Sequence, residues 1–377
     1  MSSPSTRVIG LDILRCCAIL GVLVAHGLTF LYPHVPPIPI GDWTFLLGYL
    51  GHGGFYGVEL FFVLSGFLIG RILLRTGDRL SEPSELLRFW SRRWFRTLPA
   101  YLLFLLINLA VILWVFPQPV PWDRFSGYLV FIQNFSNYGV FFFPESWSLA
   151  VEEWFYLLFP AVMWLLYRLR LPRDVVILGA GAAFYIFSTG VRWQFGADPA
   201  VDWTVEPRVV TIARFDAMMV GILAAWISLR YSSAFERFKW PTAIIGLASL
   251  GYAYTTLYAP AEAQSRLFAE TLRFNLVSFG FACLLPWGLH AKTTRIAGLD
   301  TGIRALACWS YSMYLSHMLV LRFLAERWMP EFNASPIQGY VAFVLFITIT
   351  IGLSALVYRG FEKPFTAMRD RFAFSRD

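Results

Sequence analysis

The first apolar stretch of the chain, from Arg7 to Gly27, contains Asp12, Arg15 and His26. At about 100° per residue, the eleven residues from Arg15 to His26 bring a helix back to within about 20° of the same face. The two side chains then lie roughly 16 Å apart along the helix axis. Ionisable groups at mid-membrane cost about 2.5–3.5 kcal/mol or more, so they usually face a bundle interior or a wet cavity. This stripe therefore predicts one wall of a polar path through the membrane.

Two simpler interpretations of this stripe stay open. Asp12 and Arg15 are three residues apart, so they could form a local ion pair on one helix face. His26 could be a hydrogen-bonded histidine at a helix end. In the polar-path interpretation, by contrast, a neutral imidazole can accept a proton from a hydroxyl at physiological pH.

Two adjacent glutamates, Glu152 and Glu153, lie in PESWSLAVEEWFYLLFP, one turn into a later apolar stretch. Neighbouring helical residues point about 100° apart, so at most one of the two faces a given cavity. A carboxylate at the depth of a histidine predicts an acid–base pair, in which the carboxylate orients the imidazole. We therefore predict His26 and Glu152 as catalytic residues, with Glu59 and Glu153 as alternative partners of the histidine. A carboxylate that simply lies in interfacial water is the simpler alternative.

Three arginines, Arg92, Arg93 and Arg96, lie close together in FWSRRWFRTLPAY. Guanidinium groups bind phosphates well, often through two parallel hydrogen bonds. Trp90 and Trp94 add stacking surface for an adenine or a pantetheine arm. The cluster predicts a site for a phosphate-bearing co-substrate, and an anchor for lipid headgroups is the alternative.

Other polar residues of the apolar stretches are interpreted as structural. His317 lies in CWSYSMYLSHMLV, and Ser65 lies in the Gly-rich GHGGFYGVELFFVLSGFLIG. No G-x-S-x-G elbow surrounds Ser65, so we interpret it as a packing hydroxyl rather than a nucleophile. The four cysteines lack metal-ligand spacing, so we expect apolar fillers and no bound metal.

The composition sets the fold class. Of the 377 residues, 57% are hydrophobic and 15% are charged. Soluble domains carry about 25% charged residues, so the chain is predicted to be an all-α polytopic membrane protein. The net charge of +7 then reports topology, and no basic segment suits a nucleic-acid partner.

Apolar runs of about 17–25 residues predict about ten transmembrane helices around a central polar pore or cavity. The charges inside the first run argue against a cleaved signal peptide, so we expect this helix to be retained. The aromatic segment 125–143 is expected to be re-entrant or interfacial. The predicted spans are residues 9–29, 55–75, 95–116, 148–168, 174–189, 213–229, 241–258, 268–289, 304–323 and 340–359.

The distribution of basic residues predicts the orientation. Most Lys and Arg residues fall in alternate loops on the side of the N-terminus, so both termini are expected to be cytoplasmic. The segment 71–96 is the most basic of these loops. In this topology Arg15 lies near the inner end of the first helix, whereas His26 and Glu152 lie near the outer face.

Taken together, the motifs resemble those of acyltransferase family 3, a family of integral-membrane acyltransferases. The resemblance covers residues 7–366, so we expect one acyltransferase domain over residues 1–377, with a short cytoplasmic tail at 367–377. The segments that carry it, in order, are LDILRCCAILGVLVAHG, GVELFFVLSGFLIGRIL followed by RRWFRTLPAY, SWSLAVEEWFYLLFP, RFDAMMVGILAA and SYSMYLSHMLV.

The resemblance also implies roles for individual residues. The first-helix Arg and His of the family fall on Arg15 and His26, and its WSL-x-x-E element falls on Trp147 and Glu152. Its arginine cluster falls on the three arginines of FWSRRWFRTLPAY, which with Arg15 would bind acyl-CoA. The family often has Asp at the position of Glu59, which puts any role of this longer side chain in doubt.

The resemblance implies transfer of an acyl group, most often acetyl, from cytoplasmic acyl-CoA to a hydroxyl of a carbohydrate or glycan at the outer side of the membrane. It places the chain in a bacterial inner membrane, among membrane lipids, and leaves a homodimer open. Succinyl is the alternative acyl group. A transporter or a non-catalytic membrane protein is the alternative function, although the sequence contains no inverted repeat of the kind that many transporters have.

Overall fold

The computed structural model describes residues 8–34, 51–136, 139, 142–198, 201, 206–257, 265, 267–294, 296, 298–332 and 335–372. Within these ranges every regular element is a helix, and no strand occurs. The predicted all-α class is therefore confirmed for the part of the chain that is described. Residues 373–377 of the predicted cytoplasmic tail and residues 35–50 lie outside it.

Each of the predicted spans overlaps one long helix, although several of these helices begin or end at other residues than predicted. These helices are α1 (Ile9–Gly27), α3 (Gly53–Thr76), α4 (Pro83–Ala110), α6 (Ser146–Arg168), α7 (Arg173–Ala197), α9 (Phe215–Arg230), α11 (Lys239–Thr255), α12 (Arg273–His290), α13 (Leu299–Phe332) and α14 (Pro336–Val357). Among the described residues, seven helical segments are long and apolar enough to cross a membrane, and they include α1, α3, α4, α6, α7, α9 and α14. The chain is thus an integral membrane protein by the length and apolar character of its helices.

The remaining helices are short. They are α5 (Trp122–Leu129), α8 (Glu206–Val209), α10 (Ser232–Arg237) and α15 (Lys363–Phe372). The described part of segment 125–143 contains the end of α5 followed by turns, and it contains no spanning helix. Residues 137, 138, 140 and 141 of that segment lie outside the described residues.

Helix ends follow local sequence signals. Helix α14 begins after Ser335, whose hydroxyl accepts a hydrogen bond from the backbone N–H of Gln338, and Pro336 occupies the first helical position. Helix α3 ends at Thr76 because Gly77 adopts a φ of 59°, which a side chain rarely tolerates.

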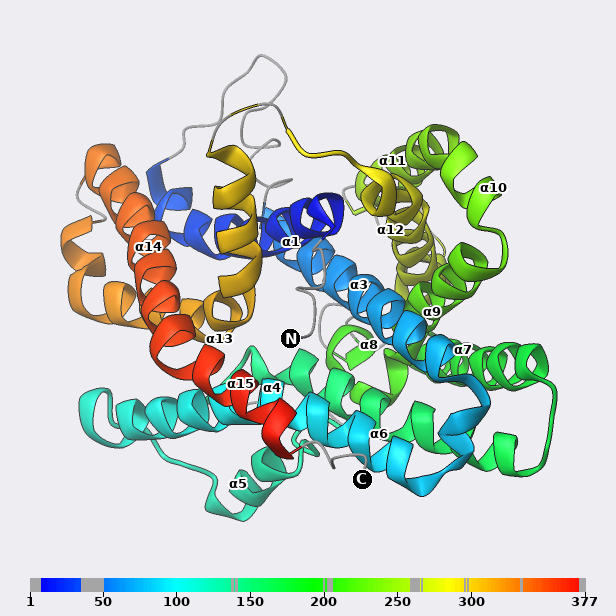
Figure 1. The fold of residues 1–377 in the computed structure, drawn as a ribbon. Coiled ribbons are helices and arrows are strands. Elements are labelled where there is room, and N and C mark those ends of the chain that lie inside the picture. The colour runs from blue at the N-terminus through cyan, green and yellow to red at the C-terminus, as the bar shows by residue number, and fades with distance from the viewer. Residues whose placement is uncertain are drawn as a thin grey trace.

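Helix α3 lies at the centre of the bundle. It packs against α1, α9 and α12, and Figure 1 shows it crossing the middle of the molecule, with α13 and α14 on one side and α9, α11 and α12 on the other. Glycines allow this close packing. A Cβ added to Gly66 would lie 2.0 Å from the carbonyl oxygen of Met218 on α9, and one added to Gly221 would lie 2.2 Å from that of Val63. Small residues of this kind let membrane helices approach closely and associate through packing.

Two buried ion pairs tie the central helices together. Arg214, at the start of α9, donates to Glu59 on α3, and both side chains are fully buried. Arg192 on α7 donates to the two carboxylate oxygens of Asp216 at 2.8 and 2.7 Å. Glu59 is therefore the counter-ion of an arginine in the core, and among the described residues it forms no hydrogen bond with His26. Charges buried this deeply are tolerated because each is paired.

Candidate active site

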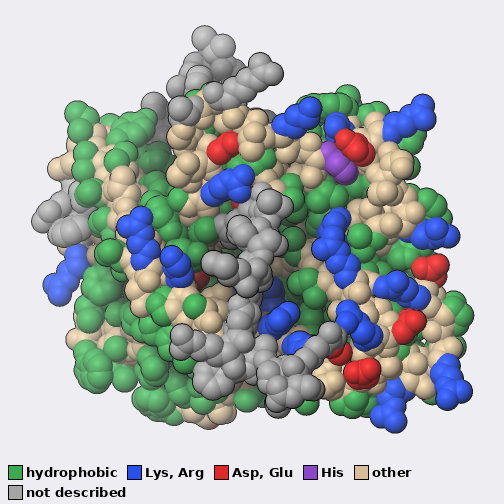
Figure 2. All heavy atoms as spheres, in the orientation of Figure 1, with side chains coloured by type: hydrophobic (Ala, Val, Ile, Leu, Met, Phe, Trp, Pro, Cys, Tyr) green, Lys and Arg blue, Asp and Glu red, His purple; other side chains and the backbone are tan. Residues whose placement is uncertain are grey.

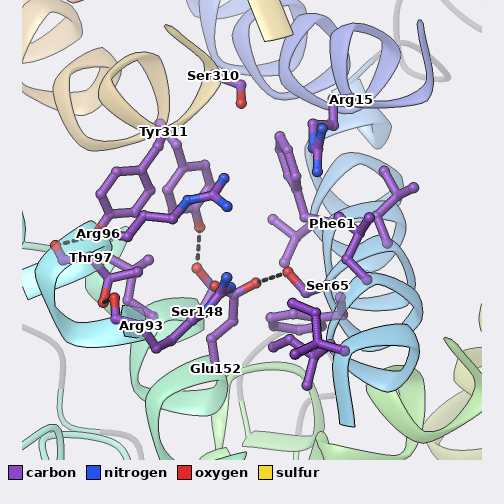
Figure 3. A pocket seen from close by; sticks show the side chains of 18 of the residues that line it. Arg15, Phe61, Ser65, Arg93, Arg96, Thr97, Ser148, Glu152, Ser310 and Tyr311 are labelled. Atoms are coloured by element: carbon purple, nitrogen blue, oxygen red, sulfur yellow. Dashed lines mark hydrogen bonds between the residues drawn. The ribbon is translucent and has the colours of Figure 1, made fainter. Parts of the chain in front are cut away.

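A cavity of about 450 Å³ opens between α1, α3, α4, α6 and α13 (Figure 3). We call it the arginine cavity because guanidinium groups enter it from three of these helices. In Figure 3, Arg15 descends from α1 and Arg96 reaches in from α4 on the opposite side. The arginines that line the cavity are Arg15, Arg71, Arg75, Arg93 and Arg96.

The predicted arginines are held in different ways. Arg93 donates to the hydroxyl of Tyr156 at 2.5 Å and lies 4.1 Å from the centre of that ring. Arg15 forms an ion pair with Asp12 at 3.0 Å, so the local pair of the simpler interpretation exists, yet Arg15 still lines the cavity. The Arg96 side chain has no hydrogen-bond acceptor among the described residues, which leaves its donors available to a ligand.

Arg92 lines a neighbouring cavity of about 240 Å³. Arg88, Arg93 and Arg96 line this cavity as well, so it shares two arginines with the arginine cavity. The structure thus brings all four predicted phosphate-binding residues to one connected region.

Glu152 also lines the arginine cavity, and its Oε1 accepts a hydrogen bond from the Ser65 hydroxyl at 2.7 Å (Figure 3). Glu153 does not line it, in agreement with the expectation that only one of the two faces a given cavity. The expected pairing of Glu152 with His26 is not present. The predicted depth of Glu152 says nothing about the direction of its side chain, which points to Ser65 on α3.

His26 lines a separate cavity of about 190 Å³, which we call the histidine cavity. Its ring centre is 5.0 Å from that of His317 on α13, so the histidine predicted to be structural is the direct neighbour of His26. Nδ1 of His317 lies 2.6 Å from the carbonyl oxygen of Tyr314, an arrangement that places a hydrogen on Nδ1. A Cβ built on Gly54 would lie 3.8 Å from Nε2 of His26, so this nitrogen faces the α3 side of the cavity.

Two residues of the histidine cavity were not predicted. Glu145, just before α6, is 4% exposed, and neither of its carboxyl oxygens has a hydrogen-bond partner among the described residues. Burial raises the pKa of Glu145 to about 8. Arg208, on α8, lies 5.8 and 5.9 Å from the ring centres of Phe55 and Trp147. Glu145 directly precedes the SWSL motif, which is a usable signal, whereas Arg208 lies in a connection without any periodic pattern.

The arginine and histidine cavities adjoin. Val58 and Tyr314 line both of them. The Tyr314 hydroxyl lies 2.6 Å from that of Ser148, which lines the arginine cavity. A ligand that extended from one cavity to the other would pass these side chains.

Metal ligands and cysteines were also considered in the sequence. No group of three or more His, Cys, Asp or Glu residues that could hold a metal occurs among the described residues. None of the four cysteines forms a disulfide among the described residues, and the Cys16 thiol donates to the carbonyl oxygen of Ile303 at 3.2 Å. The arginine cavity and the histidine cavity together can bind an anionic ligand through arginines and can move a proton at His26.

The comparison with protein families identifies this arrangement. The model of the family described as Acyltransferase domain matches residues 8–359. The chain belongs to acyltransferase family 3. The residues that the family motifs place on Arg15, His26, Arg93 and Glu152 all line one of the two adjoining cavities.

The chain is also similar to individual curated proteins. The chain is 25% identical over 385 residues to the O-acetyltransferase OatA of Staphylococcus aureus strain NCTC 8325 and, at the same identity, to OatA of strain COL. Each match covers 94% of this chain and 56% of the relative, so the chain spans about half the length of the curated relatives it matches. No solved structure matches the chain.

Proposed function

We propose that the chain is a membrane O-acyltransferase. It transfers an acetyl group from cytoplasmic acyl-CoA to a hydroxyl of a carbohydrate or glycan at the outer side of the membrane. The observation that carries the proposal is the arginine cavity adjoining the histidine cavity through Val58 and Tyr314. Family membership and the likeness to O-acetyltransferases support the reaction class.

The arginine cavity is the proposed donor site. Acyl-CoA carries phosphates at one end and a thioester at the end of its pantetheine arm. Arg93 and Arg96, with Arg92 from the neighbouring cavity, bind the phosphates through charge-assisted hydrogen bonds. The arm extends past Arg15 toward Tyr314, and the separation of roughly 16 Å between Arg15 and His26 along α1 suits its length.

The histidine cavity is the proposed site of transfer. His26 removes the proton from the acceptor hydroxyl while the hydroxyl oxygen attacks the carbonyl carbon of the thioester. The tetrahedral intermediate then collapses and expels the sulfur of CoA as a thiolate, which takes the proton from the imidazolium. His317 lies next to His26 in this step. Glu152 lies in the donor site, where its carboxylate accepts a hydrogen bond from the Ser65 hydroxyl.

The proposed topology has ten spans, both termini in the cytoplasm and a location in the bacterial inner membrane. Figure 2 shows Lys and Arg side chains spread over the face turned to the viewer, as a cytoplasmic face requires. With this orientation, the connections that carry Glu145 and Arg208 lie at the outer side with His26, and the α3–α4 connection lies at the inner side. The acyl donor and the acceptor would then reach the site of transfer from opposite sides of the membrane.

The proposal is tested with purified protein in lipid nanodiscs, radiolabelled acetyl-CoA and a short glycan. Wild-type protein is expected to acetylate the glycan, and His26→Gln to lose about 10²–10⁴-fold in turnover, the usual contribution of a general base. Its matched control is His290→Gln. His290, on α12, lies near the Pro286 carbonyl and lines neither cavity, so this variant is expected to keep its activity.

The same preparation separates the alternatives. A transporter would move acetyl-CoA or a glycan across sealed proteoliposomes without consuming the thioester. Faster transfer from succinyl-CoA than from acetyl-CoA would assign the alternative acyl group. Full turnover by a folded His26→Gln variant that binds acetyl-CoA would refute the role of His26.

A further inference from the structure

We propose that Arg208 is a catalytic residue whose guanidinium binds the oxyanion of the tetrahedral intermediate, an inference that rests on the acyl transfer proposed above. Arg208 and His26 line the same cavity of about 190 Å³. A base that activates the hydroxyl and a cation that receives the developing charge must both lie within reach of one carbonyl group. The histidine cavity is small enough to place them there.

The backbone that carries Arg208 is held firmly. Its carbonyl oxygen accepts a hydrogen bond from Arg214, which is itself ion-paired with Glu59 in the core. The next carbonyl oxygen, of Val209, accepts from the side chain of Asn134 at 2.7 Å. Asn134 is fully buried and also donates to the carbonyl oxygen of Trp147. A backbone held in this way limits how far the Arg208 side chain must move when charge develops in the transition state.

Among the described residues, no carboxylate lies within ion-pair distance of the guanidinium. It forms no ion pair or side-chain hydrogen bond within the described part of the chain, and its Nε is buried without a partner. The rings of Phe55 and Trp147 are its neighbours. Glu145, the carboxyl group of this cavity, is protonated near pH 7 because burial raises its pKa to about 8.

The remaining polar groups of the cavity do not compensate this charge. They are the imidazoles of His26 and His317 and the phenol of Tyr314, which are not anions at neutral pH. A buried charge without a partner is costly. A cation kept in this state next to a proposed base is suited to an anion that forms and disappears during turnover.

When the acceptor oxygen bonds to the thioester carbon, the electron pair of the C=O double bond moves to the carbonyl oxygen, and N–H groups of Arg208 donate to this oxyanion. When the double bond re-forms, the carbon–sulfur bond breaks and the thiolate receives the proton held by His26. Removal of one oxyanion donor typically lowers turnover by about 10²–10³-fold.

The test measures acetyl transfer by Arg208→Gln and Arg208→Lys in nanodiscs. We expect kcat to fall by about 10²–10³-fold in Arg208→Gln, with the KM values of acetyl-CoA and glycan nearly unchanged. Arg208→Lys keeps the charge and is expected to retain more activity. Added guanidinium ion is expected to restore part of the kcat of Arg208→Gly, because the deleted group leaves a cavity of its own shape.

The matched control is Arg322→Gln. Arg322, on α13, also lies over an aromatic ring, that of Phe116 at 5.4 Å, but it lines none of the three cavities, so its loss should leave kcat unchanged. A rise in the glycan KM without a fall in kcat would show that Arg208 binds an acidic group of the acceptor, and would overturn the proposal. Full kcat in a folded Arg208→Gln variant that binds acetyl-CoA would overturn it as well. If wild-type protein transfers no acyl group, the proposed function itself fails.

Discussion

At the residue scale, the space next to Nε2 of His26 decides whether a hydroxyl can reach it. Gly54→Ala is expected to lower turnover by about 10-fold or more, because its methyl group lies 3.8 Å from Nε2, where the acceptor oxygen must approach. The nearest other contact, 3.4 Å from Cβ of Ala25, is an ordinary one, so the protein should fold normally. Steady-state acetyl transfer measures the effect, and Gly179→Ala, where a Cβ meets nothing within 4 Å, is the control. Unchanged turnover in Gly54→Ala would place the reaction elsewhere.

Glu145 makes stability depend on pH. Its pKa is raised by burial from 4.5 to about 8, so between these values the unfolded chain carries the ionised carboxylate and the folded protein keeps it neutral. The contribution of Glu145 to stability therefore falls as pH rises from about 4.5 to 8, and below that range it does not change.

Glu145→Gln should therefore raise the midpoint of thermal unfolding at pH 8 by at least ~2 °C and leave it unchanged at pH 4. Intrinsic fluorescence in detergent measures both midpoints. Glu236→Gln, at an exposed site on α10, serves as the control and should show no shift at either pH. An equal shift of Glu145→Gln at both pH values would mean that the carboxyl group is not kept neutral by burial.

At the element scale, the contact between α3 and α9 depends on the absence of side chains. Gly66→Ala places a Cβ 2.0 Å from the carbonyl oxygen of Met218, and backbone cannot move away as a flexible side chain could. Overpacking of this kind typically destabilises by about 1–3 kcal/mol. The variant should unfold at a lower temperature than wild type, whereas Gly190→Ala on α7, which meets nothing within 4 Å, should be at least as stable as wild type. Equal midpoints of thermal unfolding for the two variants would show that α3 and α9 lie farther apart than in this structure.

At the scale of the whole molecule, the proposal requires the two cavities to open to opposite sides of the membrane. A cysteine at Asp123, on α5, should react with a membrane-impermeant maleimide in intact cells, because this segment follows an outward-running α4. A cysteine at Glu236, on α10, should react only after the cells are permeabilised. Both positions are exposed, so access to reagent and not burial decides the result. The reverse pattern would invert the orientation and with it the sides of donor and acceptor.

The sequence by itself determined the helical class, the positions of the long helices and the family. A continuous apolar run of about 20 residues has the length of a helix that spans a bilayer and satisfies its own backbone hydrogen bonds there, so the length and apolar character of the runs predict helices. Arg15 and His26 lie in one apolar run, which predicts that they share a helix. Residues eleven apart return to nearly the same face of that helix. These properties are local, and local sequence is sufficient to predict them.

Tertiary structure alone decided which side chains meet. Depth along a helix follows from the sequence, but the direction of a side chain depends on how neighbouring helices are rotated. For this reason Glu152 meets Ser65 in the arginine cavity and His317 becomes the neighbour of His26. The connection that carries Arg208 is held by hydrogen bonds from Arg214 to the Arg208 carbonyl oxygen and from Asn134 to the Val209 carbonyl oxygen, and no periodicity in the sequence predicts such contacts.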